Sequence, residues 1–353
     1  MGIYSSLGVR RVINASGIYS DLGGSRLAPE VWAAAGEANA VWASMDELLA
    51  LSGERVAGLV GAEAARVVPG ASAGIALAVG ACVASGEGAV MEALPLCSSC
   101  VLVQRAHAGY LYARCAALAG ARVEWVDDVA DALSALRPAA VLHPAHLDEV
   151  GMPVDEVAAL ARAAGVPVIV DAAFQCFPVS SLERWASAGD LAVFSAKYFG
   201  GPNGGGFVAG SAAAVRDLEA LDFVGYESGP WRTFGRAWKL DRATVVATAC
   251  ALEAWMGCDH DARRAGYASL AGRLAGLVGG SPCQFTFDER VLAVGPFNAV
   301  LVPGAAGLVD ALAGGDPSVR ALAHGDDLLL CVETVSSSEI DEIAAAMSAR
   351  CQN

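Results

Sequence analysis

Residues 166–173 read Val-Pro-Val-Ile-Val-Asp-Ala-Ala, and this stretch does most to indicate the fold. A short, wholly apolar run that is rich in β-branched residues is typical of a strand buried in a parallel sheet. The run follows Gly165, which closes a helical pattern at 155–164. We therefore predict a helix that leads into a buried strand, with Asp171 just beyond the carboxyl end of that strand.

Segments of helical and strand-like pattern alternate along residues 29–209, as they do in α/β proteins. We predict helices at 29–51, 54–61, 71–84, 101–119, 155–164 and 181–188. We predict strands at 64–68, 89–91, 122–126, 139–142, 166–170, 191–194 and 206–209. Because parallel strands need a crossover between them and helices supply it, the fold class is α/β with a mostly parallel central sheet.

The pattern changes after Trp231. We predict helices at 242–256, 263–278 and 338–349, and short strands near Phe285 and at 291–294, 298–302 and 328–332. This order is typical of a smaller α+β domain with antiparallel pairing. The predicted organisation is an N-terminal arm (1–30), a large domain (31–240) and a small C-terminal domain (241–353).

Composition excludes several classes of protein. The chain has 353 residues, of which 55% are hydrophobic, so it can bury a sizeable core. The net charge of −15 gives no general attraction to phosphate backbones, so we expect no nucleic-acid partner. The longest apolar stretch, 71–84, is shorter than the roughly 20 residues that a membrane span needs. We expect that stretch to be a buried helix, and no membrane partner.

Cysteine usage and the N-terminus favour a cytoplasmic protein. The 10 cysteines are irregularly spaced and several lie in apolar runs, as buried, reduced thiols do. Cys97 and Cys100 have C-x-x-C spacing, but no second pair follows to complete a zinc site, so we expect no metal. A redox role for this pair is the less favoured interpretation. Residues 1–17 lack the apolar core of a signal peptide, and we expect none.

Three candidate functional residues, Ser72, Asp171 and Lys197, each lie just after a predicted strand. In parallel sheets the carboxyl ends of the strands meet at one edge, and ligands bind there. We therefore expect the three residues to contribute to a single site.

The residue types in this site match the needs of pyridoxal phosphate, which are a lysine, an anion site and a carboxylate. Lys197 would hold the cofactor as a Schiff base and then act as a base at the substrate Cα. Asp171 would keep the pyridine nitrogen protonated. The helix start in Gly70-Ala71-Ser72-Ala73-Gly74 would bind the phosphate through its backbone N–H groups.

Each of these residues also has a simpler interpretation. A lysine is most often a surface residue, an aspartate after a strand often caps a loop, and small residues at a helix start often mark close packing. Lys239 is the other lysine considered, and it lies among charged residues. The glycine-rich stretch 200–206 contains Pro202 and precedes a strand, which argues against a dinucleotide-binding loop.

With these residues assembled, the chain resembles the fold-type I pyridoxal-phosphate enzymes, and within them the group of selenocysteine synthase and glucosaminate-6-phosphate ammonia-lyase. The resemblance covers most of the chain, and its motifs are specific only when taken together. They are Asn14-Ala15-Ser16-Gly17, residues 22–27, Met45-Asp46-Glu47-Leu48, residues 61–65, residues 70–74, Val170-Asp171-Ala172-Ala173, Phe194-Ser195-Ala196-Lys197 and residues 235–242.

The resemblance implies a sheet of the seven-stranded type with helices on both faces, and a homodimer or larger homo-oligomer with the active site at the subunit interface. It implies Lys197 and Asp171 as catalytic residues. The cofactor-binding residues it implies are Gly70, Ala71, Ser72, Ala73, His107, Asp171, Ala173, Ser195 and Lys197. The substrate-binding residues it implies are Arg26, Arg236 and Glu333.

Three features depart from that group. We expect no extra N-terminal RNA-binding region, and the chain is strongly acidic, so we do not expect tRNA as a substrate. Glu333 stands where the group has an arginine, which implies that a substrate anion is bound differently or that the substrate carries a cation. Ala196, before the lysine, also differs from the usual residue.

Three hypotheses for function follow. The first is a lyase that eliminates ammonia or another β-substituent from an amino acid or an amino-acid-like compound. The second is an aminotransferase, a racemase or a β-replacement enzyme on the same cofactor, which the sequence does not separate from the first. The third is a non-catalytic relative that has kept the fold.

Overall fold

The structure is a computed structural model that describes residues 2–95, 98–286 and 289–351, so Cys97 of the C-x-x-C pair lies outside the described residues. The chain forms two compact units. The large unit is Arg26–Gly257, and the small unit combines Met1–Ser25 with Cys258–Asn353. Helix α11 (Arg242–Met256) belongs to the large unit, where it packs on α2 (Pro29–Ala40) and α3 (Met45–Val60). The predicted boundary after residue 240 therefore differs from this division by one helix.

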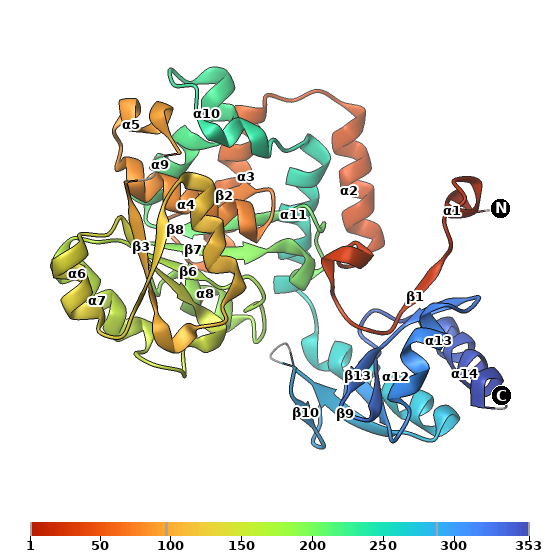
Figure 1. Cartoon of the computed structure of the whole chain (residues 1–353). Coiled ribbons are helices and arrows are strands. Elements are labelled where there is room, and N and C mark those ends of the chain that lie inside the picture. The colour runs from red at the N-terminus through yellow and green to blue at the C-terminus, as the bar shows by residue number, and fades with distance from the viewer. Residues whose placement is uncertain (1, 96–97, 287–288, 352–353) are drawn as a thin grey trace. The chain divides into compact units, whose positions relative to one another are not determined.

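The large unit is built around a seven-stranded sheet of order β2-β8-β7-β6-β5-β3-β4 (Figure 1). Its strands are β2 (Ala64–Val68), β3 (Cys100–Gln104), β4 (Arg122–Val126), β5 (Ala140–Pro144), β6 (Val168–Asp171), β7 (Leu191–Ser195) and β8 (Gly206–Gly210). Only β8 runs against its neighbours. The predicted fold class, a mostly parallel α/β sheet, is confirmed.

Helices cover both faces of this sheet, and two buried apolar clusters lie between them and the strands. Side chains alternate along each strand, so Ile169 and Val193 face one cluster while Val170 and Phe194 face the other. The first cluster is covered by α3, α6 (Val129–Leu136), α7 (Val154–Ala164), α8 (Ser180–Ala186) and α11. The second is covered by α4 (Ala71–Ala84), α5 (Gly88–Ala93), α9 (Ala212–Leu221) and the 3-10 segment η3 (Leu111–Ala119).

Helix α4 is the buried helix that the apolar stretch 71–84 predicted. Ten of its 14 residues are buried, which identifies it as a core element. It approaches the sheet closely at Gly74, where a Cβ would lie 2.7 Å from Cγ1 of Val193. Among the helices of the described residues, none has the length and apolarity that crossing a membrane requires.

Three predicted elements are wrong. Residues 89–91, predicted as a strand, lie in helix α5, and residues 101–119, predicted as one helix, form β3 followed by η2 (Arg105–His107) and η3. Short apolar runs look alike in buried strands and buried helices, which explains both errors. The predicted helix at 29–51 is two helices that break at 41–44, and α3 continues through Gly53.

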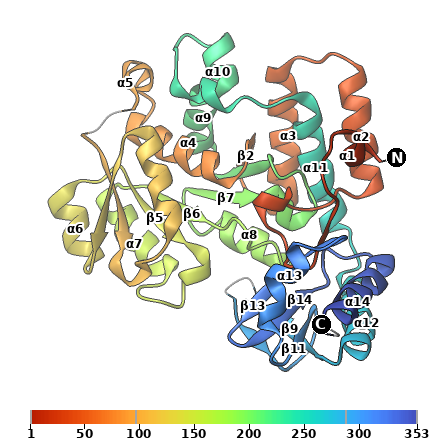
Figure 2. The same cartoon turned by 45° about the vertical axis from the view of Figure 1, so that its right-hand side comes forward.

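The small unit contains an antiparallel sheet of order β10-β9-β11-β14-β13 packed against helices (Figure 2). Its strands are β9 (Ser281–Phe285), β10 (Val291–Leu292), β11 (Ala299–Val302), β13 (Leu322–His324) and β14 (Asp327–Cys331). Its helices are α1 (Ile3–Ser6), α12 (His260–Val278), α13 (Val309–Ala313) and α14 (Ser337–Cys351), with short 3-10 segments at Ser20–Leu22 and Ala306–Leu308. The predicted antiparallel α+β character is confirmed.

The N-terminal residues are tied into the small unit by backbone pairing. Strand β1 (Val12–Asn14) pairs in parallel with β12 (Ser318–Arg320), and Ile13 is fully buried in the core of that unit. The hydroxyl of Thr334 donates a hydrogen bond to the carbonyl oxygen of Asn14 at 2.6 Å. The small unit is therefore built from the N-terminal segment as well as from the C-terminal part of the chain.

Candidate active site

The candidate site lies at the carboxyl edge of the seven-stranded sheet, and strand order decides which residues meet there. Asp171 ends β6, and its backbone is in register with Pro144 of β5 and Val193 of β7. Lys197 follows β7 directly, in the 3-10 segment η5 (Ala196–Phe199). Helix α4 begins just after β2, which runs in the same direction as β7. The structure thus brings the three predicted segments to one edge of one sheet.

The carboxylate of Asp171 is buried, with 6% of the residue exposed, and is held by two donors. The hydroxyl of Tyr110 donates to Oδ2 at 2.6 Å, and the backbone N–H of Ala173 donates to Oδ1 at 3.1 Å. Burial raises the pKa of Asp171 above its usual range, while these two hydrogen bonds and the nearby His146 oppose the rise. The two hydrogen bonds therefore fix the orientation of the carboxylate, and together with His146 they favour its ionised form.

A row of ring-bearing side chains runs along this edge from Asp171 to Lys197. We call Tyr110, His146, Phe174 and Tyr198 the aromatic row; successive ring centroids are 5.9, 5.3 and 5.8 Å apart. Nζ of Lys197 lies 4.9 Å from the ring centroid of Tyr198. The four residues follow four neighbouring strands, β3, β5, β6 and β7, so the row crosses the sheet edge. Such a surface suits a flat, partly apolar ring.

Helix α4 begins at Ala71, directly after Gly70, and backbone N–H groups at a helix start can bind an anion. Gly70, the residue before the helix, has φ 83°, which only glycine adopts without strain. Gly70 has no side chain with which to cap the N–H groups of the first turn. Gly206 lies against Gly70, since a Cβ at 206 would be 3.1 Å from Cα of Gly70. The glycine-rich stretch 200–206 leads into strand β8, as its sequence predicted.

Two further predicted cofactor residues, Ser195 and His107, are both buried. Ser195 is buried at the end of β7, and its backbone N–H donates to the carbonyl oxygen of Ala173. His107 is 1% exposed; its Nε2 lies 2.7 Å from the carbonyl oxygen of Val150, and its ring meets that of His143 edge-on. The role of His107 stays a prediction, and His146 is the histidine that joins the aromatic row.

The predicted substrate residues are distributed over both units. Arg26 is exposed in the large unit, and Nε of Arg236 forms an ion pair with Oε1 of Glu227 at 2.5 Å. Glu333 belongs to the small unit, where Oε1 accepts a hydrogen bond from Nδ2 of Asn298 at 3.2 Å. Burial raises the pKa of Glu333, while Asn298 and the nearby Arg263 oppose that rise. Their roles toward a substrate stay predictions.

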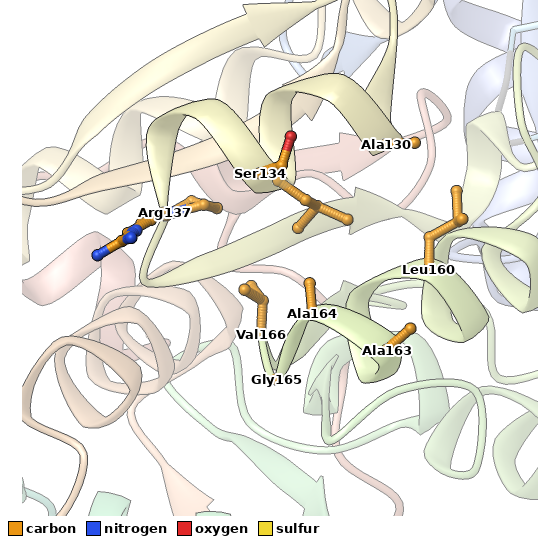
Figure 3. A pocket seen from close by; sticks show the side chains of 10 residues that line it. Ala130, Ser134, Arg137, Leu160, Ala163, Ala164, Gly165 and Val166 are labelled. Carbon is orange, nitrogen blue, oxygen red and sulfur yellow. The ribbon is translucent and has the colours of Figure 1, made fainter.

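A surface hollow of about 620 Å³ lies at the other edge of the sheet (Figure 3). It is lined by the ends of α6 and α7, including Ser134, Arg137 and Gly165, just before β5 and β6 begin. Ligands of parallel sheets bind at the carboxyl edge, so this hollow is separate from the candidate site. In the part of the chain that the structure describes, no cluster of three or more His, Cys, Asp or Glu could hold a metal ion.

Tyr110, His146, Phe174 and Tyr198 are not among the site residues that the sequence predicts. The available signal was their position, because each follows a strand of the parallel sheet within a few residues. For Tyr110 that signal is hidden, because the sequence pattern predicts a helix where β3 lies.

Comparison with known proteins gives two curated relatives, and no family model matches the chain. A 5'-C-glycyluridine monooxygenase-decarboxylase from a Streptomyces species is 34% identical over 239 residues, which are 62% of this chain and 58% of that protein. The match therefore spans less than two thirds of that relative. The D-glucosaminate-6-phosphate ammonia lyase of Salmonella typhimurium (strain 14028s / SGSC 2262) is 32% identical over 269 residues, which are 71% of this chain and 69% of that protein.

Solved structures give the same picture. A structure of D-glucosaminate-6-phosphate ammonia-lyase matches with a TM-score of 0.83 and 25% identity, and the match covers 100% of both chains. The ureidoglycine-glyoxylate aminotransferase of Bacillus subtilis matches with a TM-score of 0.57 and 13% identity, covering 97% of this chain and 92% of that one. The second likeness concerns the fold alone.

Proposed function

Because the chain belongs to the family of D-glucosaminate-6-phosphate ammonia-lyase, we propose that it is a lyase of fold type I that uses pyridoxal phosphate. The observation that carries this proposal is the buried carboxylate of Asp171, joined to Lys197 by the aromatic row. The substrate class we propose is an amino acid or an amino-acid-like compound. The narrower resemblance to selenocysteine synthase stays a prediction.

The residues of the site fit the proposed cofactor. An ionised carboxylate has about four acceptor positions, and the two described donors to Asp171 leave room for a ring N–H. The aromatic row offers a surface for the ring, and the start of α4 with Gly70 offers N–H groups for the phosphate. When bound, pyridoxal phosphate supplies a ring into which negative charge from the substrate Cα can spread.

Lys197 has two tasks in this proposal. Its Nζ would hold the cofactor through the aldehyde group, and as a free amine it would take the proton from the substrate Cα. The aromatic face of Tyr198 beside Nζ restricts the positions of that amine. Asp171, in its ionised form, would hold a protonated ring nitrogen. Removal of the Cα proton would allow a β-substituent to depart, which is an elimination.

The chain contains only two lysines, which makes the covalent step directly testable. Lys197 lies at the site, and Lys239 is exposed. We expect the wild type and the Lys239→Ala variant to gain visible absorbance with added pyridoxal phosphate. After borohydride reduction, peptide mapping should locate the cofactor at position 197, and Lys197→Ala should gain no stable label. A wild-type protein that takes up no cofactor would refute the proposal and favour a non-catalytic relative.

Product analysis separates elimination from the other reactions on the same cofactor. Release of ammonia and a keto acid from one substrate supports a lyase. A stoichiometric requirement for a keto-acid acceptor would identify an aminotransferase, and inversion at Cα without net change a racemase. A product that joins an added nucleophile to Cβ would identify β-replacement. The homodimer and the cytoplasmic location remain predictions, as does the absence of a nucleic-acid partner.

A further inference from the structure

Tyr110 contacts Asp171, although Tyr110 belongs to none of the sequence motifs that predicted the site. The two side chains meet at 2.6 Å, from the phenolic oxygen of Tyr110 to Oδ2 of Asp171. Tyr110 is 4% exposed and Asp171 is 6% exposed, so little water reaches the contact. In the sheet, β5 separates β3 from β6, and Tyr110 therefore reaches across one strand to meet the carboxylate.

The direction of this hydrogen bond is settled by the chemistry of the two groups. Burial raises the pKa of the Tyr110 phenol well above its usual value, and the charge of Asp171 raises it further. The phenol therefore keeps its proton and donates it, while the carboxylate accepts. Hydrogen bonds to a charged acceptor favour its ionised form, and here that effect opposes the burial of Asp171.

We propose that Tyr110 is a positioning residue for the cofactor, because its hydroxyl keeps Asp171 ionised and aimed so that the carboxylate can hold a protonated ring nitrogen. This inference rests on the proposed function and deepens it. Tyr110 acts through Asp171, since its phenolic oxygen is already committed to that carboxylate. The remaining acceptor positions of the carboxylate serve the ring.

The proposal predicts how cofactor affinity depends on pH. An Asp171 that has become protonated must lose its proton before it can hold a protonated ring nitrogen, so affinity falls as pH drops below the pKa of Asp171. Tyr110→Phe removes the donor and moves this fall to higher pH. A hydrogen bond to a charged group corresponds to roughly one to two pKa units, so we expect roughly tenfold to hundredfold weaker binding of pyridoxal phosphate on the acid side. The loss should disappear at higher pH.

A cofactor analogue separates this role from a structural one. The probe is the deaza analogue of pyridoxal phosphate, in which C–H replaces the ring nitrogen. The deaza analogue has no ring N–H, so an ionised Asp171 adds nothing to its affinity. Beside the C–H group, a protonated and therefore neutral Asp171 is preferred. Tyr110→Phe should therefore bind the deaza analogue as tightly as the wild type, or more tightly. A variant that is merely distorted would lose affinity for both compounds alike.

The experiment measures dissociation constants of both compounds by absorbance titration of the full chain across a pH series. Tyr112→Phe is the matched control, because Tyr112 neighbours Tyr110 but is 56% exposed, and it should behave as the wild type. Comparing Asp171→Asn with the double variant Asp171→Asn/Tyr110→Phe separates the charge effect from poor folding. Because Asp171→Asn leaves no charge to stabilise, adding Tyr110→Phe should change the affinity less than about twofold, whereas a folding defect would lower it further.

The outcomes are distinguishable. A pH-dependent loss for pyridoxal phosphate without a loss for the deaza analogue supports the proposal. Equal losses for both compounds, or unchanged affinity at every pH, overturn it while leaving the proposed function intact. A wild type that binds neither compound overturns the proposed function itself.

Discussion

Lowering the pH should destabilise the large unit through one buried histidine, His143. This residue lies in β5 and is 1% exposed. Its Nε2 lies 2.8 Å from Oδ1 of Asp148, an oxygen that also accepts the backbone N–H of Val154 at 2.7 Å. Burial lowers the pKa of His143 to about 4, with a further contribution from His107, although Asp148 opposes the shift.

The size and sign of the effect follow from the two protonation states. In the unfolded chain a histidine has a pKa of about 6.5, so at about pH 5 it is almost fully protonated, whereas folded His143 is still mostly neutral. The unfolded state then binds more protons, and stability falls as pH drops from about 6.5 toward 4. At about 1.4 kcal/mol per pH unit, over about 1.5 units, the loss at pH 5 is about 2 kcal/mol.

Urea unfolding followed by tryptophan fluorescence measures this loss. All seven tryptophans lie in the large unit, so the signal reports on that unit alone. We compare the wild type with His143→Gln, which does not titrate, at about pH 8 and about pH 5. The variant is less stable at pH 8 because its contact with Asp148 is altered, and the gap should narrow by about 2 kcal/mol at pH 5.

The control is His324→Gln, which removes an exposed histidine of the small unit and should keep the wild-type pH dependence. A gap between wild type and His143→Gln that stays constant from pH 8 to pH 5 would contradict the reasoning, because it would mean that His143 titrates alike in the folded and unfolded chains.

Two packing predictions concern the same unit and the same fluorescence assay. Gly74→Ala places a Cβ 2.7 Å from Val193 and should lower the free energy of unfolding by about 1–3 kcal/mol. The control is Gly58→Ala, which has open space around it and should be neutral or slightly stabilising. Equal effects of the two substitutions would argue against tight packing of α4. Arg66→Met leaves the buried carboxylate of Asp222 without its partner at 2.7 Å and should lower the free energy of unfolding by about 3–5 kcal/mol. Adding Asp222→Asn removes the unpaired charge and should restore part of that loss. No recovery in the double variant would show that the ion pair is not the cause.

Local sequence was sufficient for the central strands and for the chemistry at their ends. The run before Asp171 and the run before Lys197 are continuous apolar strands because both faces of a parallel sheet are buried. The same patterns were insufficient at 89–91 and 101–119, where short apolar runs fit either kind of element. The sequence also predicted the helical crossovers and the change to antiparallel pairing in the small unit, because the patterns of apolar residues behind both predictions extend over many residues.

Side-chain periodicity and strand-end position are local properties of the chain, so the amino-acid sequence was enough to predict that a lysine and an aspartate follow buried strands. The hydrogen bond from Tyr110 to Asp171, 61 residues away, and the aromatic row from there to Lys197 are visible only in the folded protein. These contacts depend on the strand order β7-β6-β5-β3. Strand order results from packing whole helices and strands together, and no short stretch of sequence carries it.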